Sequence, residues 1–222
     1  MTFRFIDTSC YLISLEARED RRAQFVENTD KQGFALNTFE WIQAVEDKDF
    51  GGLGCAKSHL LAMTKFMTET ENEYCCIFED DFNFRDTREE SEKTINYTLS
   101  KFSDWNVFLL GGTKLIPMPT NAEIGMYQVN QVFEAATTSG YIVRRNYVKQ
   151  LMINCMDSII GMERFRATTP RSLIYHKFAI DQTWKKLQRT DNWYCTTPML
   201  GAQIPSYSDI EKAEIDYTHT SA

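Results

Sequence analysis

The sequence predicts an α/β fold, with helices on both faces of a largely parallel central sheet. Short runs with strand character alternate along the chain with helical runs, which is the pattern of this class. Residues 74–78 are continuously apolar, as expected of a strand that is buried on both faces. Acidic residues 79–81 and the glycine pair 111–112 follow directly after two predicted strands. Ligands of such folds bind at the carboxyl ends of the strands, so these segments mark the expected site.

The first quarter of the chain is expected to hold two strands around a helix. Residues 11–15 form an apolar strand, and 18–28 follow as a helix with a polar face that stops near Gly33. Residues 39–45 alternate apolar and polar side chains with period two, which indicates a second strand. The glycine-rich stretch 51–54 is expected to be a flexible loop.

The rest of the chain continues the alternation. Apolar residues at helical spacing predict a helix over 57–68, and Thr87 to Glu90 have the spacing of a capping box that opens another helix. Residues 105–110 and 139–143 are predicted strands. The helices that complete the chain are expected to be capped by Asn146, for a helix running to Ile159, and by Asp181, for a helix over 182–188.

Composition and charge exclude several classes of protein. The net charge is −7 with no basic tail, and this argues against nucleic-acid binding, which needs a cationic surface. No apolar run approaches the roughly 20 residues of a membrane span, and the N-terminus lacks the apolar core of a signal peptide. Six cysteines without a C-x-x-C pair indicate free buried thiols rather than a zinc site. A single domain over residues 1–222 is therefore expected, either cytoplasmic or an excised or viral soluble domain.

The acidic triplet Glu79, Asp80 and Asp81 is the sharpest local signal. Three adjacent carboxylates at the end of a buried strand repel one another unless a cation lies among them. Oxygen ligands favour Mg²⁺ or Mn²⁺, and residues two apart on a strand point the same way, so Glu79 and Asp81 could share one ion. A solvated acidic turn, with an Asp that caps the next helix, is the alternative explanation of the triplet.

Basic residues near two predicted helix starts could bind an anion. Arg18, Arg21 and Arg22 follow the first strand, and guanidinium groups bind phosphates well. They could equally form a solvated face paired with nearby acids. The segment from Gly54 to His59 opens a helix, where backbone N–H groups and Lys57 could take an anion, although it has no Walker A spacing.

Two further residues have a structural and a functional interpretation. Asp181 could cap its helix, or it could act as a general base that takes a proton from an acceptor hydroxyl. His59 lies on a helix that packs against the core, where a lone histidine is commonly structural. Both interpretations stay open for each residue at this point.

The ordered set of motifs resembles glycosyltransferase family 25, whose members include bacterial lipooligosaccharide galactosyltransferases and collagen β-galactosyltransferases. The resemblance runs from about residue 11 to about residue 210. It is carried by Tyr-Leu-Ile-Ser-Leu-x-x-Arg-x-x-Arg-Arg (11–22), Gly-Cys-x-x-Ser-His (54–59), Ile-Phe-Glu-Asp-Asp (77–81), Ser-Gly-Tyr-Ile-Val (139–143), Asp-x-x-Trp (181–184) and Ser-Asp-Ile (208–210).

The resemblance implies a GT-A-type three-layer α/β/α sandwich with a Rossmann-like sheet. It implies a nucleotide-sugar half over about 1–112 and an acceptor half over about 113–222. The implied reaction moves a hexose, galactose or glucose, from a UDP-sugar to a glycan or other hydroxyl-bearing acceptor in glycan or lipopolysaccharide biosynthesis. The resemblance also implies inversion at the anomeric carbon and a Mn²⁺ or Mg²⁺ cofactor.

The resemblance also assigns roles to residues. Glu79, Asp80 and Asp81 match the acidic metal motif, Asp209 is a candidate further ligand, and Asp181 matches an acidic residue on the acceptor side. The residues that fall in the nucleotide neighbourhood are Ser14, Leu15, Arg18, Arg22, Gly54, Lys57, Ser58, His59 and Asp80. Relatives often carry Glu where this chain has Gly52, a departure that bears on the donor contacts.

Two rival functions remain compatible with the sequence. A metal-dependent nucleotide-sugar hydrolase or nucleotidyltransferase would use the same acidic residues without needing a sugar acceptor. A catalytically inactive carbohydrate-binding module would keep the fold and turn over no nucleotide-sugar.

Overall fold

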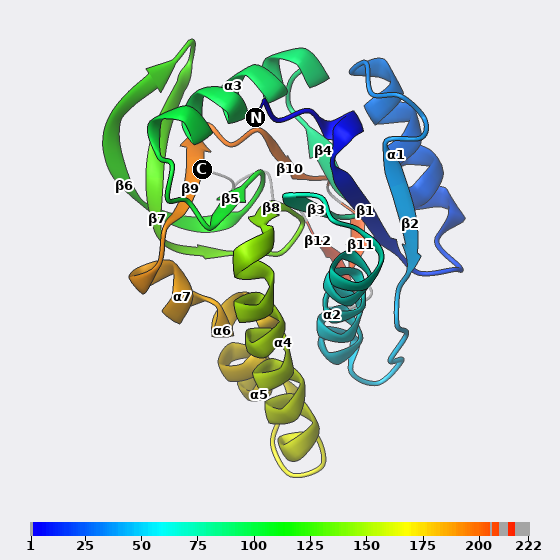
Figure 1. Ribbon diagram of the computed structural model, residues 1–222. Coiled ribbons are helices and arrows are strands. Elements are labelled where there is room, and N and C mark those ends of the chain that lie inside the picture. Colours follow the sequence, from blue (N-terminus) through cyan, green and yellow to red (C-terminus); the bar gives the residue numbers. More distant parts are fainter. Residues whose placement is uncertain (1, 205, 209–212, 216–222) are drawn as a thin grey trace.

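An eight-stranded sheet runs through the middle of the molecule (Figure 1). The structure is a computed structural model that describes residues 2–204, 206–208 and 213–215. In spatial order the strands of the sheet are β2 (Phe39–Gln43), β1 (Ser9–Ser14), β3 (Tyr74–Glu79), β8 (Gly140–Arg144), β5 (Val107–Leu109), β9 (Trp193–Thr197), β7 (Tyr127–Ala136) and β6 (Thr113–Ile124). Two small pairs lie outside it, formed by β4 (Phe82–Phe84) with β10 (Gly201–Gln203) and by β11 (Ser206–Ser208) with β12 (Ala213–Ile215).

The direction of the strands brings several carboxyl ends to one edge of the sheet. β1 pairs in parallel with both β2 and β3, and β5 pairs in parallel with β9. Within this sheet β8 and β7 run against the other strands. The prediction of an α/β fold with a mostly parallel central sheet is confirmed, and the acidic segment that follows β3 lies at the edge where β1 and β2 also end.

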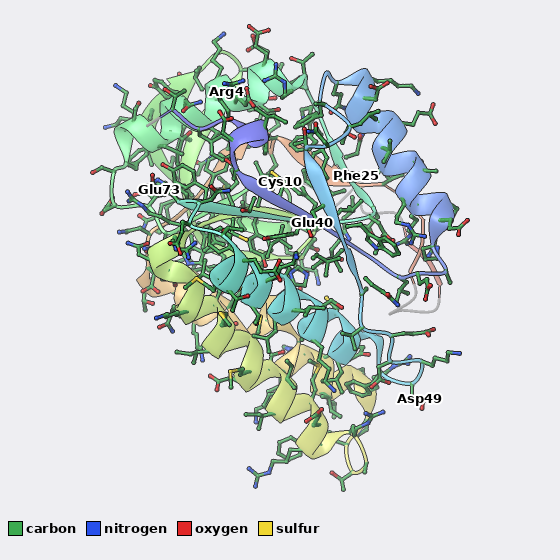
Figure 2. The ribbon with its side chains drawn as sticks, turned by 45° about the vertical axis from the view of Figure 1, so that its right-hand side comes forward. Arg4, Cys10, Phe25, Glu40, Asp49 and Glu73 are labelled. Atoms are coloured by element: carbon green, nitrogen blue, oxygen red, sulfur yellow. The ribbon has the colours of Figure 1, made fainter. Side chains whose placement is uncertain are left out.

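Helices cover both faces of the sheet. They are the 3-10 helix η1 (Phe5–Asp7) and the α-helices α1 (Glu19–Lys31), α2 (Gly51–Glu69), α3 (Arg88–Lys101), α4 (Arg145–Phe165), α5 (Arg171–Phe178), α6 (Ile180–Thr183) and α7 (Lys185–Thr190). α2 and α4 lie side by side along one face, whereas Cys10 and Phe25 mark the core under α1 on the other (Figure 2).

The alternation of side chains along β3 explains the two cores. Cys75 and Ile77 belong to the cluster under α2 and α4, and Cys76 and Phe78 belong to the cluster under α1 and α3. Successive residues of a strand point to opposite faces, so a continuously apolar strand serves both cores at once. The predicted burial of this strand on both faces and the three-layer arrangement are confirmed.

The glycine-rich segment differs from its prediction as a loop, because residues 51–54 form the first turn of α2. A Cβ atom on Gly54 would lie 2.4 Å from the carbonyl oxygen of Val45, in the loop that follows β2. The Ser58 hydroxyl also accepts the backbone N–H of Val45 at 2.8 Å. The glycine therefore permits a close approach of the helix to this loop rather than flexibility.

Helix starts were predicted with mixed success. Thr87 caps α3 as predicted, since its side chain accepts the N–H of Glu90. The predicted caps Asn146 and Asp181 are wrong: α4 begins directly after β8 with Arg144 at the cap position, and Ala179 is the cap of α6. The helix predicted over 182–188 is instead divided between α6 and α7.

One large feature has no counterpart among the predictions. Residues 113–136 form the long hairpin of β6 and β7 at one end of the sheet (Figure 1). β6 is an edge strand that carries Pro117 and Pro119 and has several register shifts against β7. Proline is tolerated at a sheet edge, but it obscures the strand signal in a sequence.

The remaining predictions concern cysteines and membrane spans. All six cysteines are free, and all but the partly buried Cys55 are buried, as predicted for free thiols. Among the described residues no helix combines the length and the apolar character needed to cross a bilayer.

We predict that Gly54→Ala destabilises the protein although alanine favours helices. Overpacking against the fixed backbone of Val45 costs about 1–3 kcal/mol, more than the roughly 1 kcal/mol that alanine gains over glycine in a helix. Thermal unfolding should show a melting temperature lowered by a few degrees. Thr64→Ala, at an exposed position of the same helix, is the control and should change little; an unchanged Gly54→Ala protein would contradict the close approach.

Candidate active site

A cleft of about 490 Å³ opens at the carboxyl edge of β1, β2 and β3. Its walls come from the ends of these strands, the first turns of α2, the segment before β8, and α5 and α6. Binding sites for small molecules commonly measure about 300–1,000 Å³, so the cleft is of a size that holds an organic ligand. This is the position at which α/β sheets bind ligands.

The cleft brings together most of the residues singled out from the sequence. Those that line it are Ser14, Leu15, Arg18, Ser58, His59, Glu79, Asp80, Asp81 and Asp181. Arg22, Gly54 and Lys57 are not among the lining residues. Asp209 lies outside the described residues.

Asp80 and Asp81 share one guanidinium group. Arg21, on the first turns of α1, places Nη1 2.9 Å from Asp80 Oδ1 and 3.5 Å from Asp81 Oδ2. The other oxygen of Asp80 accepts the Ser14 hydroxyl at 2.6 Å. Asp81 has weaker partners, with Gln203 Nε2 3.4 Å from each of its oxygens. Asp81 is therefore the carboxylate with the more available oxygens.

Glu79 has a different set of partners. It is the last residue of β3, so the period-two geometry that would align it with Asp81 does not extend through the turn that follows. Its Oε1 lies 3.2 Å from His59 Nε2 and also accepts the Thr138 hydroxyl. The structure therefore joins Asp80 to Asp81 through Arg21, while Glu79 is held by His59 and Thr138.

Burial sets the protonation behaviour of the acidic cluster. Burial, together with the neighbouring charge of Glu79, raises the pKa of Asp81 to about 7, although Arg21 opposes this shift. Burial also raises the pKa of Asp80 against the hydrogen bond from Ser14 and the charge of Arg21. For Glu79, burial favours a higher pKa, but hydrogen bonds from His59 and Thr138 outweigh it and the pKa is lowered.

The donor set of the cluster fits a hard divalent cation. Three carboxylates face one guanidinium, which leaves an excess of about two negative charges when all are ionised. Carboxylate oxygens are preferred ligands of Mg²⁺ and Mn²⁺. Asp81, with its long hydrogen bonds, and the neighbouring Asp80 are the residues that would hold such an ion.

Asp181 reaches the cleft from the first turn of α6. Its Oδ2 accepts the backbone N–H of Thr137 and the side chain of Gln182, each at 3.1 Å. Burial raises the pKa of Asp181 in spite of these two donors. A carboxylate with a raised pKa at the wall of a cleft is suited to accept a proton from a bound hydroxyl.

The sequence profile of glycosyltransferase family 25, described as an LPS biosynthesis protein, matches residues 49–166, more than half of the chain. The chain belongs to glycosyltransferase family 25. The matched region contains α2, the acidic cluster, β8 and α4. The predicted family is thus confirmed. The protein is a glycosyltransferase, and as such it takes a sugar donor and an acceptor.

Comparisons with other proteins add distant similarities in structure. Mannose-1-phosphate geranyltransferase from Thermus thermophilus shares 12% identity at a TM-score of 0.43, over 85% of this chain and 73% of that one. A197 from STIV shares 8% sequence identity at a TM-score of 0.47, over 86% of this chain and 81% of that one. A glycosyltransferase involved in the glycosylation of the major capsid of PBCV-1 shares 9% identity at a TM-score of 0.41, over 92% of this chain and 96% of that one. No curated protein sequence matches the chain.

Arginine roles in this glycosyltransferase differ from residue to residue along α1. Arg18 lines the cleft and pairs with Asp20 at 3.0 Å. Arg22 turns instead to the loop after β1, where it donates to the carbonyl oxygens of Leu15 and Glu16 and stacks on Trp41. Its position supports the loop that forms one wall of the cleft.

Gly54, Lys57 and Ser58 make packing and ion-pair contacts that hold α2 in place. Gly54 and Ser58 pack α2 against the loop after β2, and the Ser58 hydroxyl also donates to the Gly54 carbonyl. Lys57 forms a 2.7 Å ion pair with Glu163 of α4. Anion binding by this segment stays a prediction.

Gly52, where relatives often carry Glu, packs directly against Tyr175. The N–H of Gly52 donates to the Tyr175 hydroxyl at 3.0 Å, and a Cβ atom at this position would lie 2.7 Å from the tyrosine ring. Tyr175, from α5, therefore fills the space that a glutamate side chain would need. Both residues line the cleft, so this family member has its own wall at this point.

The contacts that hold the cleft carboxylates come from residues for which the sequence did not predict this role. Arg21 was one of three arginines, and only the phase of α1 shows that it faces the carboxylates. Thr137 and Thr138 donate to Asp181 and Glu79 respectively, and Gln203 donates to Asp81. Thr137 adopts φ 78°, which is unfavourable for a β-branched residue and is typical of strained functional segments.

We predict that metal-free protein loses stability as the pH rises, because of Asp81. Its pKa is higher in the folded protein than in the unfolded chain. Its stabilising contribution to the free energy of unfolding is therefore present below about pH 4 and is lost as the pH rises through about 7. In chelator-treated protein, Asp81→Asn should melt higher than wild type at about pH 8, and the gap should shrink toward about pH 4.5.

The measurement is thermal unfolding of both proteins across this pH range. Groups far from the acidic cluster titrate equally in both proteins, so the difference between the two curves reports Asp81 together with its effect on Glu79 and Asp80. Parallel curves for wild type and Asp81→Asn would contradict the assigned burial of this carboxylate.

Proposed function

We propose that this protein transfers a hexose from a UDP-sugar to a hydroxyl group of a glycan acceptor, with inversion and with Mn²⁺ or Mg²⁺ as cofactor. The observation that carries the proposal is the buried Asp80 and the largely buried Asp81, which share one guanidinium at the carboxyl edge of the sheet, in a cleft that Asp181 also lines. Membership of glycosyltransferase family 25 supports the reaction class.

The leaving group of this reaction is a nucleoside diphosphate, which develops negative charge. A divalent ion bound by Asp81 and Asp80 would neutralise that charge in a cleft of low dielectric. Arg21 holds the two carboxylates in place, because it contacts both, and its charge opposes the rise in their pKa that burial causes. Leu15 and Arg18 line the same end of the cleft and are suited to the nucleotide.

The acceptor hydroxyl needs a base on the opposite side of the sugar. Asp181 supports this role because Thr137 and Gln182 hold one of its oxygens, Oδ2, by hydrogen bonds, which orients the carboxylate. The other oxygen, Oδ1, would take the proton as the hydroxyl attacks the anomeric carbon. Thr137 and Thr138 are adjacent and bind Asp181 and Glu79, so one short segment ties the base to the acidic end of the cleft.

We predict that Asp80→Ala or Asp81→Ala abolishes metal-dependent nucleotide binding while the fold survives. UDP with Mn²⁺ should raise the melting temperature of wild type, because a ligand that binds only the folded state stabilises it. The same mixture should leave either variant unchanged. Asp157→Ala, an exposed acid on α4, is the control and should respond like wild type. A variant that UDP and Mn²⁺ stabilise as much as wild type would refute the metal assignment.

We predict that Asp181→Asn keeps donor binding and loses about 10²–10⁴-fold in the rate of sugar transfer. Asparagine can still accept from Thr137 and Gln182 through its oxygen, so the local structure should persist, but it cannot take a proton. The measurements are the thermal shift with UDP-sugar and the transfer rate, with Asp157→Asn as the matched control. A fully active Asp181→Asn enzyme would exclude the base role.

The same assays separate the rival functions. A nucleotide-sugar hydrolase or nucleotidyltransferase would turn over the donor at a rate that the sugar acceptor does not raise. An inactive carbohydrate-binding module would turn over no donor under any condition. Turnover that depends on the acceptor supports sugar transfer.

A further inference from the structure

A second group of possible metal ligands lies at the wall of the cleft, beside the acidic cluster. Cys55 and His59 of α2 and Glu79 of β3 each place a ligand atom within 4.8 Å of the other two. Cys55 and His59 are four residues apart, so they lie on one face of the helix. All three line the cleft, which gives an ion a path to them.

The environment of His59 favours metal binding. The imidazole is fully buried, its Nδ1 lies 2.9 Å from the Tyr141 hydroxyl, and its Nε2 lies 3.2 Å from Glu79 Oε1. A hydroxyl can donate or accept a hydrogen bond, so the Tyr141 hydroxyl can accept one from Nδ1–H in the tautomer that binds a metal. In that tautomer Nε2, which otherwise hydrogen-bonds Glu79, is unprotonated and can coordinate. A histidine ligand oriented by a partner on its other nitrogen is the usual arrangement at metal sites.

The chemistry of this group differs from that of Asp80 and Asp81. Thiolate, imidazole and carboxylate together form a donor set of Zn²⁺, whereas oxygen-only sets suit Mg²⁺ and Mn²⁺. Ligand atoms around tetrahedral zinc lie about 3.3–3.8 Å apart. His59 Nε2 and Glu79 Oε1, 3.2 Å apart, are already close to this separation, and the Cys55 sulfur lies within 4.8 Å of both.

We propose that Cys55, His59 and Glu79 bind a zinc-class divalent cation at a site separate from the Asp80–Asp81 pair. The Cys55 thiol releases its proton to solvent on binding, and its sulfur becomes a ligand. The fourth position of the ion faces the cleft. Thr138 contacts two of the three proposed ligands: its hydroxyl lies 4.0 Å from the Cys55 sulfur and is hydrogen-bonded to Glu79. The chain has no C-x-x-C pair to supply two neighbouring zinc ligands. Cys55 and His59, four residues apart on one helix, would supply them instead.

The test is titration of the full chain with Co²⁺, a spectroscopic substitute for Zn²⁺. Coordination by a thiolate gives a near-ultraviolet charge-transfer band that carboxylate coordination does not give. We expect the band in wild type, its loss on adding Zn²⁺, and its persistence on adding Mn²⁺. Cys55→Ser should lack the band, while Cys195→Ser, which removes a buried cysteine outside the cleft, should keep it.

Two further arms keep the outcome decisive. Asp81→Asn should retain the band, so failure of the proposed Mn²⁺ site would not affect this result. In wild type alone, Zn²⁺ should protect Cys55 from alkylation, as mapped by mass spectrometry, which needs no variant to fold. Absence of the band in wild type, its persistence in folded Cys55→Ser, or unprotected Cys55 in the presence of Zn²⁺ would overturn the proposal.

Discussion

The contact of Arg21 with Asp80 and Asp81 is the constraint on which the site depends. Two buried carboxylates at the end of a strand are costly, and a single guanidinium offsets part of that cost. Arg21 reaches them because β1 and β3 are parallel neighbours, with Ile13 opposite Glu79, and α1 starts a few residues after β1. The parallel register of these two strands therefore places cation and carboxylates at the same edge of the sheet.

The compensation by Arg21 is incomplete, and this has a functional meaning in a glycosyltransferase. Asp81 keeps long hydrogen bonds and a raised pKa, so the cluster carries charge that the protein itself does not neutralise. Such local conflicts with stability are typical of functional sites. A divalent ion with the diphosphate of a donor would resolve this one, in keeping with the function proposed for the protein.

A short strained segment of the cleft lining connects the acidic cluster to Asp181. Thr137 and Thr138 lie between β7 and β8, and they donate to Asp181 and Glu79 respectively. This segment therefore joins a carboxylate suited to base catalysis with the last residue of β3. Glu79 also faces His59 and lies near Cys55, so the acidic cluster and the group formed by Cys55, His59 and Glu79 adjoin at the end of β3. The two metal sites proposed for these groups would differ in the metals they prefer, and Glu79 lies beside both.

The sequence by itself determined the features that depend on local pattern. The continuous apolar run of β3, the Thr87 cap, the stop of α1 near Gly33 and the order of the family motifs all follow from neighbouring residues. They sufficed to predict an α/β fold and glycosyltransferase family 25, and to place the acidic triplet at a strand end.

The tertiary structure alone decided which side chains meet. Successive residues on a helix turn by about 100°, so the phase of α1 against the sheet selects Arg21 for the carboxylates and turns Arg22 to the loop. A glycine-rich segment such as 51–54 is compatible both with a flexible loop and with a helix that packs closely against another backbone. Only the contact between Gly54 and Val45 in the folded protein shows that the second case applies. Pairings such as Thr137 with Asp181 join distant parts of the chain, and no local pattern encodes them.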